Sequence, residues 1–166
     1  MDIRTPTGET QIAELKVGDK INMSGIIFTG RDAVLPRIVR LIEENRLGEL
    51  GLDLGGAVVF HTAVSDAGIG PTSSNKVEIE GSIPALSKAG VKIHLGKGSL
   101  SAETVETLAE YNSVFVVTPP VTALFSKSIL SKEIAAFSEL GMEAFYRLTV
   151  KNIPGIVAIA HNKTIF

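Results

Sequence analysis

The chain has 166 residues with a formal net charge of −2, and 45% of its residues are hydrophobic. This length and composition predict one globular domain with an aliphatic core, and they exclude a disordered chain. The near-neutral charge excludes a broad basic surface for nucleic acid or membrane, and the lack of Cys excludes disulfides and thiolate-held metal on this chain. The polar start has no signal-peptide core and no apolar run reaches membrane-spanning length, so we expect a cytoplasmic protein.

The first half of the chain predicts a polar leading arm followed by strand, helix and strand. Residues 1–14 form the arm, and residues 15–166 form the domain. We expect strands over 21–28 and 57–62. Between them, apolar residues recur at helical spacing, which predicts a helix. Pro36 is tolerated in its first turn, and the helix is expected to end at Gly48.

After a turn-rich link at 65–71, helices and strands alternate again. Residues 73–90 are expected to be helical in two pieces broken at Gly81, with Ser82 as the second cap. A further helix at 101–112 begins at Ser101, which is the expected N-cap. Strands flank that helix over 91–96 and 113–118.

The last part predicts a short helix and two closing strands. The helix or helical turn is expected within 121–131. The strands are expected over 142–150 and 155–160, with a turn at 152–155. This order of elements favours an α/β domain with a mixed sheet.

Three polar loops follow three of these strands: TGRD from Thr29, GPTSSNK from Gly70, and GKGS from Gly96. Ligands of open α/β sheets bind beyond the carboxyl ends of strands, where backbone N–H groups and helix N-termini attract anions. The loops bring three cations and several hydroxyls: Arg31, Lys76, Lys97, Thr29, Thr72, Ser73, Ser74 and Ser99. Together they predict a site for a small anion with more than one carboxylate or phosphate.

Each loop taken alone also fits an ordinary structural role. Arg31 fits a solvated surface residue, GPTSS fits turn and capping chemistry, and GKG fits a common turn. His61 and His94 fit half-buried side chains with satisfied hydrogen bonds better than ligands. No metal-ligand cluster, P-loop or hydrolase elbow is present in the sequence.

The motifs LKVGDKINMSGIIFTGRDA, GGAVVFH, GPTSSNK, VKIHLGKG and ELGMEAFYRLTVKNIPGIVAI stand in an order that resembles one family. It is the C-terminal domain, or separate β subunit, of the iron–sulfur class I fumarate hydratases and L-tartrate dehydratases. The resemblance implies a single-domain swivelling β/β/α fold. It also implies a partner α subunit that holds a four-iron, four-sulfur cluster, with no cofactor bound by this chain.

The resemblance further implies roles for the loop residues. Arg31 would bind a substrate carboxylate, Thr72 would be the catalytic base, and Lys97 would bind substrate. Lys76 stands where the family usually has Arg, so this position keeps its positive charge but lacks the planar guanidinium group. The expected site is completed by Ser73 and by the loop glycines Gly30, Gly70, Gly96 and Gly98.

The function implied is that of a hydro-lyase β subunit, with fumarate hydration to L-malate as the leading hypothesis. L-tartrate dehydration is the nearest alternative, because it needs the same kind of site for a substrate with one more hydroxyl. The departures at Lys76 and Ser99 leave a third hypothesis open, a non-catalytic anion-binding or assembly module of the same fold.

Overall fold

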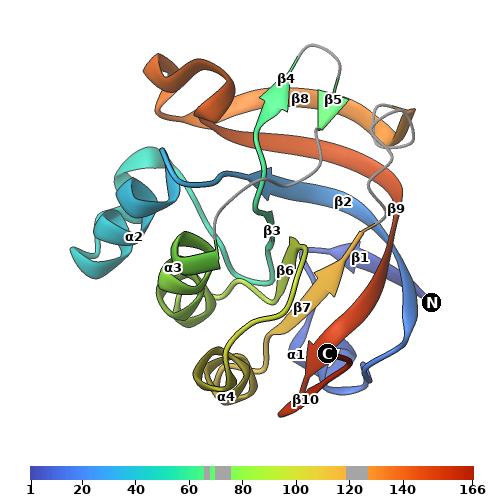
Figure 1. The fold of residues 1–166 in the computed structure, drawn as a ribbon. Coiled ribbons are helices and arrows are strands. Elements are labelled where there is room, and N and C mark those ends of the chain that lie inside the picture. Colours follow the sequence, from blue (N-terminus) through green and yellow to red (C-terminus); the bar gives the residue numbers. More distant parts are fainter. Residues whose placement is uncertain (66–67, 70–75, 119–126) are drawn as a thin grey trace.

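A computed structural model describes residues 1–65, 68–69, 76–118 and 127–166 of the chain (Figure 1). The expectations for GPTSSN and for residues 121–126 lie outside the described residues. The strands are β1 (Asp2–Thr5), β2 (Lys20–Thr29), β3 (Val58–Phe60), β4 (Val64–Ser65), β5 (Gly68–Ile69), β6 (Ile93–Gly96), β7 (Val114–Val117), β8 (Ile129–Ala136), β9 (Phe145–Ala160) and β10 (Lys163–Thr164). The helices are α1 (Glu9–Ala13), α2 (Leu35–Glu43), α3 (Lys76–Lys88) and α4 (Ala102–Glu110), with 3-10 turns η1 (Leu47–Leu50) and η2 (Ser138–Glu143).

Among the described residues, eight strands form one mixed sheet, which confirms the α/β prediction. Strands β2, β3, β6 and β7 are parallel neighbours in that order. The long strand β9 runs antiparallel to both β7 and β2, so it closes these strands into a barrel. In the same sheet, β1 lies along β2, while β8 and β10 pair with β9.

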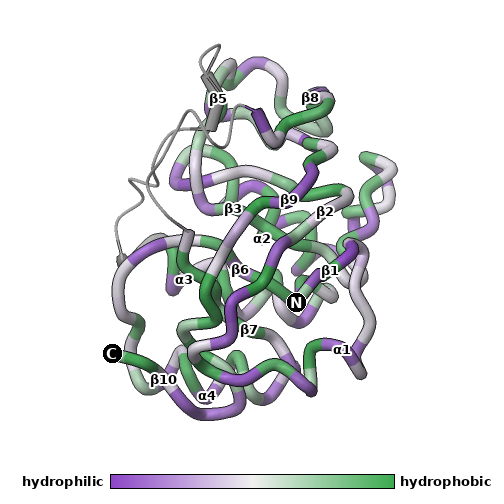
Figure 2. Tube along the Cα trace, turned by 90° about the vertical axis from the view of Figure 1, so that its right-hand side faces the viewer, coloured by the Kyte–Doolittle hydropathy of each residue, from purple (hydrophilic) through white to green (hydrophobic). Residues whose placement is uncertain are grey.

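The core has two layers because strand side chains alternate between the two faces of the barrel wall. Inward-facing residues such as Ile27, Phe60 and Leu95 fill an interior of mostly aliphatic side chains. Outward-facing residues such as Val59 and Phe115 pack beneath α2, α3 and α4, which lie together on one side of the sheet (Figure 1). Figure 2 shows the resulting concentration of hydrophobic chain around β6 and β7.

The first 14 residues, expected to form a leading arm, contain β1 and α1 and join the fold through both. Ile3 and Ile12 are buried in the barrel core. The Glu9 carboxylate lies 2.6 Å from Lys92 Nζ, and it accepts a hydrogen bond from Asn112 at 2.7 Å. These two contacts, with Asn112 contributing first, lower the pKa of Glu9.

The closing segment forms one continuous strand, so the prediction of two strands and a turn is wrong. Asn152 does adopt a left-handed backbone, with φ 55°. It does so within β9, where the register against β2 shifts between Met23 and Gly25. The Asn152 N–H donates to Ser24 Oγ at 2.9 Å, so the turn-forming sequence makes a β-bulge that bends the strand around the barrel.

Three helical predictions also need correction. α3 runs unbroken through Gly81, and Ser82 donates to the Ile79 carbonyl at 3.0 Å inside the helix, so it is not a cap. α2 ends at Glu43, before the expected stop at Gly48. Of the short helix expected within 121–131, residues 127–128 are helical, but from Ile129 onward the chain is strand β8, which pairs with β9. By contrast, Ser101 caps α4 as predicted, accepting from the Thr104 N–H at 3.3 Å.

Within the described ranges, no helix has both the length and the apolar character that crossing a membrane requires.

Candidate functional site

The four parallel strands end at one edge of the barrel, which we call the carboxyl edge. The register places Thr29 of β2, Phe60 of β3 and Leu95 of β6 in one row. Along the chain, Arg31 comes two residues after Thr29, and Lys97 comes two residues after Leu95. Since neighbouring strands lie about 4.8 Å apart, their backbones leave the sheet roughly 10 Å from each other. The predicted site residues Arg31 and Lys97 therefore share one edge.

Arg31 is already engaged by a carboxylate. Its Nε donates to Glu143 Oε1 at 2.7 Å and to Oε2 at 3.0 Å, and its Nη2 also contacts Oε1. The side chains are only 25% and 27% exposed, and the hydrogen bonds that the guanidinium donates to Glu143 raise its pKa. Glu143 lies 112 residues further along the chain, at the end of η2, and no local sequence pattern predicts this pair.

The loop glycines at the carboxyl edge allow close packing and a tight turn. A Cβ at Gly30 would lie 2.8 Å from Val34 Cγ1, at the start of α2. A Cβ at Gly96 would lie 3.0 Å from the Phe115 ring. Gly98 has φ +84°, which favours glycine, and it turns the chain so that Lys97 is exposed.

The remaining predicted residues are on the second loop. Gly70, Thr72 and Ser73 lie outside the described residues, so their positions stay predictions. Lys76 is the first residue of α3. Its backbone therefore begins the helix that covers β3 and β6, and its proposed contact with substrate also stays a prediction.

Beneath α3, a buried polar chain starts at the carboxyl edge, and the sequence did not predict it. His61 directly follows β3, and its Nε2 lies 3.2 Å from His94 Nδ1 on β6. His94 Nε2 in turn lies 2.9 Å from Ser87 Oγ on α3. Both imidazoles are completely buried, so the expectation of half-buried rings is wrong. Burial lowers the pKa of His61 to about 4, and burial followed by the nearby His61 lowers the pKa of His94.

Two buried polar atoms have no hydrogen-bond partner among the described residues: His61 Nδ1 and Thr29 Oγ1. They lie on opposite faces of the barrel wall. Thr29 alternates with Phe28 and so shares the inward face of Ile27. His61 alternates with the inward-facing Phe60, and its ring therefore lies in the outer layer beneath α3. The two atoms therefore belong to separate environments.

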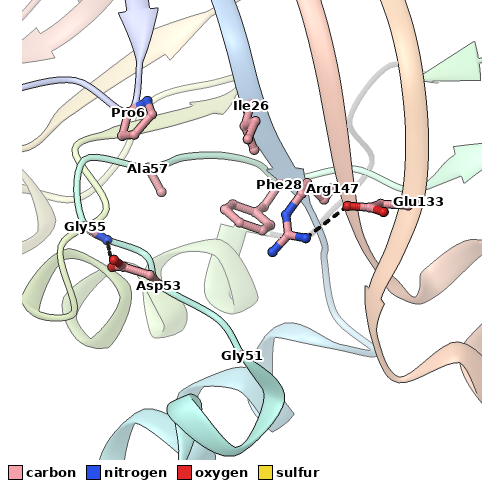
Figure 3. A pocket seen from close by; sticks show the side chains of 9 residues that line it. All are labelled: Pro6, Ile26, Phe28, Gly51, Asp53, Gly55, Ala57, Glu133 and Arg147. Atoms are coloured by element: carbon pink, nitrogen blue, oxygen red, sulfur yellow. Dashed lines mark hydrogen bonds and ion pairs between the residues drawn. The ribbon is translucent and has the colours of Figure 1, made fainter.

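A cavity of about 420 Å³ opens on the outer side of β2, away from these groups (Figure 3). Its floor includes Phe28, and the Arg147 guanidinium lies over that ring at 5.5 Å. Arg147 also donates to Glu133 at 2.9 Å, and Asp53 accepts from the Gly55 N–H at 2.9 Å. Its charged side chains already have partners, and neither Arg31 nor Lys97 lines it.

The described residues contain no group of three or more His, Asp or Glu side chains placed to hold a metal ion. The whole sequence lacks Cys, so this chain offers no thiolate ligand. The chemistry available at the carboxyl edge is therefore that of cations, a buried imidazole pair and backbone N–H groups.

Comparison with known proteins identifies the family. The model described as "Fumarase C-terminus" matches residues 1–165. A protein of Methanocaldococcus jannaschii, provisionally named L(+)-tartrate dehydratase subunit beta, is 31% identical over 172 residues, covering 93% of this chain and 85% of its own length. The L(+)-tartrate dehydratase subunit beta of Escherichia coli is 28% identical over 184 residues, covering 99% of this chain and 89% of its own.

A protein of Geobacillus stearothermophilus, provisionally named class I fumarate hydratase, is 29% identical over 170 residues. That match covers 95% of this chain and 31% of the relative, so the chain spans about a third of that relative's length. The family model and these relatives cover nearly all of the chain, and they agree with the order of the motifs in the sequence. The chain belongs to the fumarase C-terminus family.

Proposed function

We propose that this chain is the β subunit of a two-chain iron–sulfur hydro-lyase that acts on a small dicarboxylate. The observation that carries the proposal is the family match over residues 1–165. Relatives named as fumarate hydratase and as tartrate dehydratase are both hydro-lyases, which supports the reaction type. In this proposal the fold is the swivelling β/β/α domain that the family resemblance implies.

Arg31 is the proposed anchor for one substrate carboxylate. Its contact with Glu143 supports this role, because the guanidinium there donates hydrogen bonds to both oxygens of a carboxylate. A planar fork that forms two parallel hydrogen bonds suits that ligand. Lys97, exposed on the same edge, supplies a second positive charge for the other carboxylate.

The second loop supplies the proton-transfer group in this proposal. Thr72 removes the carbon-bound proton, with Ser73 and Lys76 beside it in the sequence. A neutral hydroxyl is a weak base, so neighbouring positive charge must lower its pKa. Lys76 at the start of α3 provides such a charge, together with the favourable field of a helix N-terminus.

The proposed partner is an α subunit that carries the four-iron, four-sulfur cluster. The naming of two relatives as β subunits supports a separate partner chain. Without Cys, this chain does not have the thiolates that ligate such clusters. When bound by the partner, the cluster supplies a Lewis acid for the substrate hydroxyl.

Fumarate hydration to L-malate is the leading reaction, and L-tartrate dehydration is the second candidate. The second is favoured by the relatives named as tartrate dehydratase subunits, which are 28% and 31% identical and are matched over most of their length. The two reactions differ by one substrate hydroxyl, so the same carboxylate-binding groups serve both.

Co-expression with a candidate α chain that contains three cluster-binding Cys, under anoxic conditions, tests the proposal. The purified complex is assayed with L-malate, fumarate, L-tartrate and mesaconate. We expect turnover of fumarate or L-tartrate by the complex and none by this chain alone. Full turnover by the single chain would contradict the two-chain scheme. A complex inactive on all four compounds would support the non-catalytic module instead.

A further inference from the structure

The buried chain His61–His94–Ser87 constrains where its protons lie. Both imidazoles are neutral near pH 7 because complete burial lowers their pKa values. A neutral imidazole has one N–H donor and one bare nitrogen acceptor. The two contacts, His61 Nε2 to His94 Nδ1 and His94 Nε2 to Ser87 Oγ, therefore allow only two complete proton arrangements.

In the first arrangement, Ser87 donates to His94 Nε2, and His94 Nδ1–H donates to His61 Nε2. The His61 proton is then on Nδ1, and this N–H is the one group of the three side chains that has no partner among the described residues. In the reverse arrangement, His61 Nδ1 is a bare acceptor, and the Ser87 hydroxyl proton also lacks an acceptor among the described residues. Since each buried unpaired polar group costs free energy, the first arrangement is favoured.

We propose that His61 Nδ1–H donates a hydrogen bond to an oxygen of the anion bound at the carboxyl edge, with His94 and Ser87 positioning its proton. This inference rests on the proposed function, which supplies a dicarboxylate. Carboxylate oxygens accept hydrogen bonds and cannot donate them, so only the first arrangement gives a bond to such a ligand.

The backbone around His61 supports this placement. The Gly30 N–H donates to the Phe60 carbonyl at 3.0 Å, and the His61 N–H donates to the Leu95 carbonyl at 3.0 Å. His61 is therefore held in the row between Gly30 and Gly96. His94 pairs in register with Val59, two residues before His61, so the Nε2 contact faces the start of β3. His61 therefore directly follows the row of Thr29, Phe60 and Leu95, at the edge where the loops of Arg31 and Lys97 begin.

The proton positions are measured by long-range 1H–15N NMR of the full chain labelled in histidine, near neutral pH and without ligand. We expect protonated Nδ1 and bare Nε2 in both His61 and His94. Ser87→Ala removes the donor that fixes this arrangement, so it should shift both rings toward the other tautomer. A bare Nδ1 in wild-type His61 would overturn the inference.

Two variants of the assembled complex separate the two ring nitrogens. The amide of Asn reaches the place of Nδ1, whereas that of Gln reaches the place of Nε2. His61→Gln keeps a group for His94 and loses the ligand donor, so kcat/KM should fall about tenfold to a hundredfold. His61→Asn keeps the ligand donor and loses the contact with His94, so its kcat/KM should fall less than that of His61→Gln. Equal losses in the two variants would mean that His61 is only structural.

The same experiments separate failure of this inference from failure of the proposed function. If the wild-type complex turns over none of the four compounds, the proposed function fails. The ligand-free spectra do not depend on turnover: a bare His61 Nδ1 refutes the inference, and a protonated one keeps the donor that the inference requires. Loss of folding in either His61 variant also leaves the wild-type spectra as the deciding measurement.

Discussion

The buried histidine pair predicts a loss of stability in mild acid. The folded-state pKa of His61 is about 4, below its ordinary value of 6.5, because the charged ring would be desolvated. The unfolded chain therefore takes up the proton first. The contribution of His61 is fully present above about pH 6.5 and is lost as the pH falls toward about 4.

The size of the effect follows from the pKa shift. One pKa unit corresponds to about 1.4 kcal/mol, so lowering the pH from about 6.5 to about 5 should remove about 2 kcal/mol through His61 alone. His94 is shifted in the same direction, by burial first and then by His61, and it adds to the loss in the same pH window. Glu9, whose lowered pKa starts from 4.5, acts below that window.

Urea unfolding followed by far-ultraviolet circular dichroism at several pH values measures this loss, since the chain lacks Trp. The matched control is the double variant His61→Gln/His94→Gln, in which the free energy of unfolding should depend much less on pH between about 6.5 and 5. A wild-type free energy of unfolding that stays constant across that interval would refute the reasoning. So would an equal slope in the double variant.

Three further predictions concern Arg31 as the substrate anchor, the packing of the barrel, and Thr72 as the catalytic base. Arg31→Ala should cost about 2–4 kcal/mol of transition-state stabilisation, measured as kcat/KM of the assembled complex. An unchanged kcat/KM would count against Arg31 as the substrate anchor. Gly155→Ala places a Cβ 2.4 Å from Val116 Cγ1, so it should destabilise the fold by about 1–3 kcal/mol in urea unfolding. Gly48→Ala, with open space around it, is the control and should change stability by less than about 0.5 kcal/mol. Thr72→Ala should lower kcat far more than it raises KM, and equal effects on the two would reassign Thr72 to substrate positioning.

Local sequence patterns were sufficient for the elements whose neighbours in space are also neighbours along the chain. The apolar runs before Thr29 and Thr118 predicted β2 and β7, and Ser101 predicted the start of α4. Because parallel strands bring their carboxyl ends together, the sequence also predicted that the loops of Arg31 and Lys97 share one edge.

Long-range packing decided the features that the sequence patterns missed. Asn152 and its neighbours have turn-forming residues, yet pairing with β2 on one side makes a bulge more favourable than a turn. Gly81 stays helical because α3 packs against the sheet through Ile79 and Ile83, which are buried on either side of it. In both places tertiary contacts outweigh a local preference of about 1 kcal/mol.

The sequence by itself determined the alternation of strands and helices, the family and the edge at which a site is expected. Only the tertiary structure decided which side chains meet there. Glu143 reaches Arg31 across 112 residues, and His94 reaches His61 across 33. Such pairs depend on barrel closure and on the register of parallel strands, and neither leaves a periodic signal in the sequence.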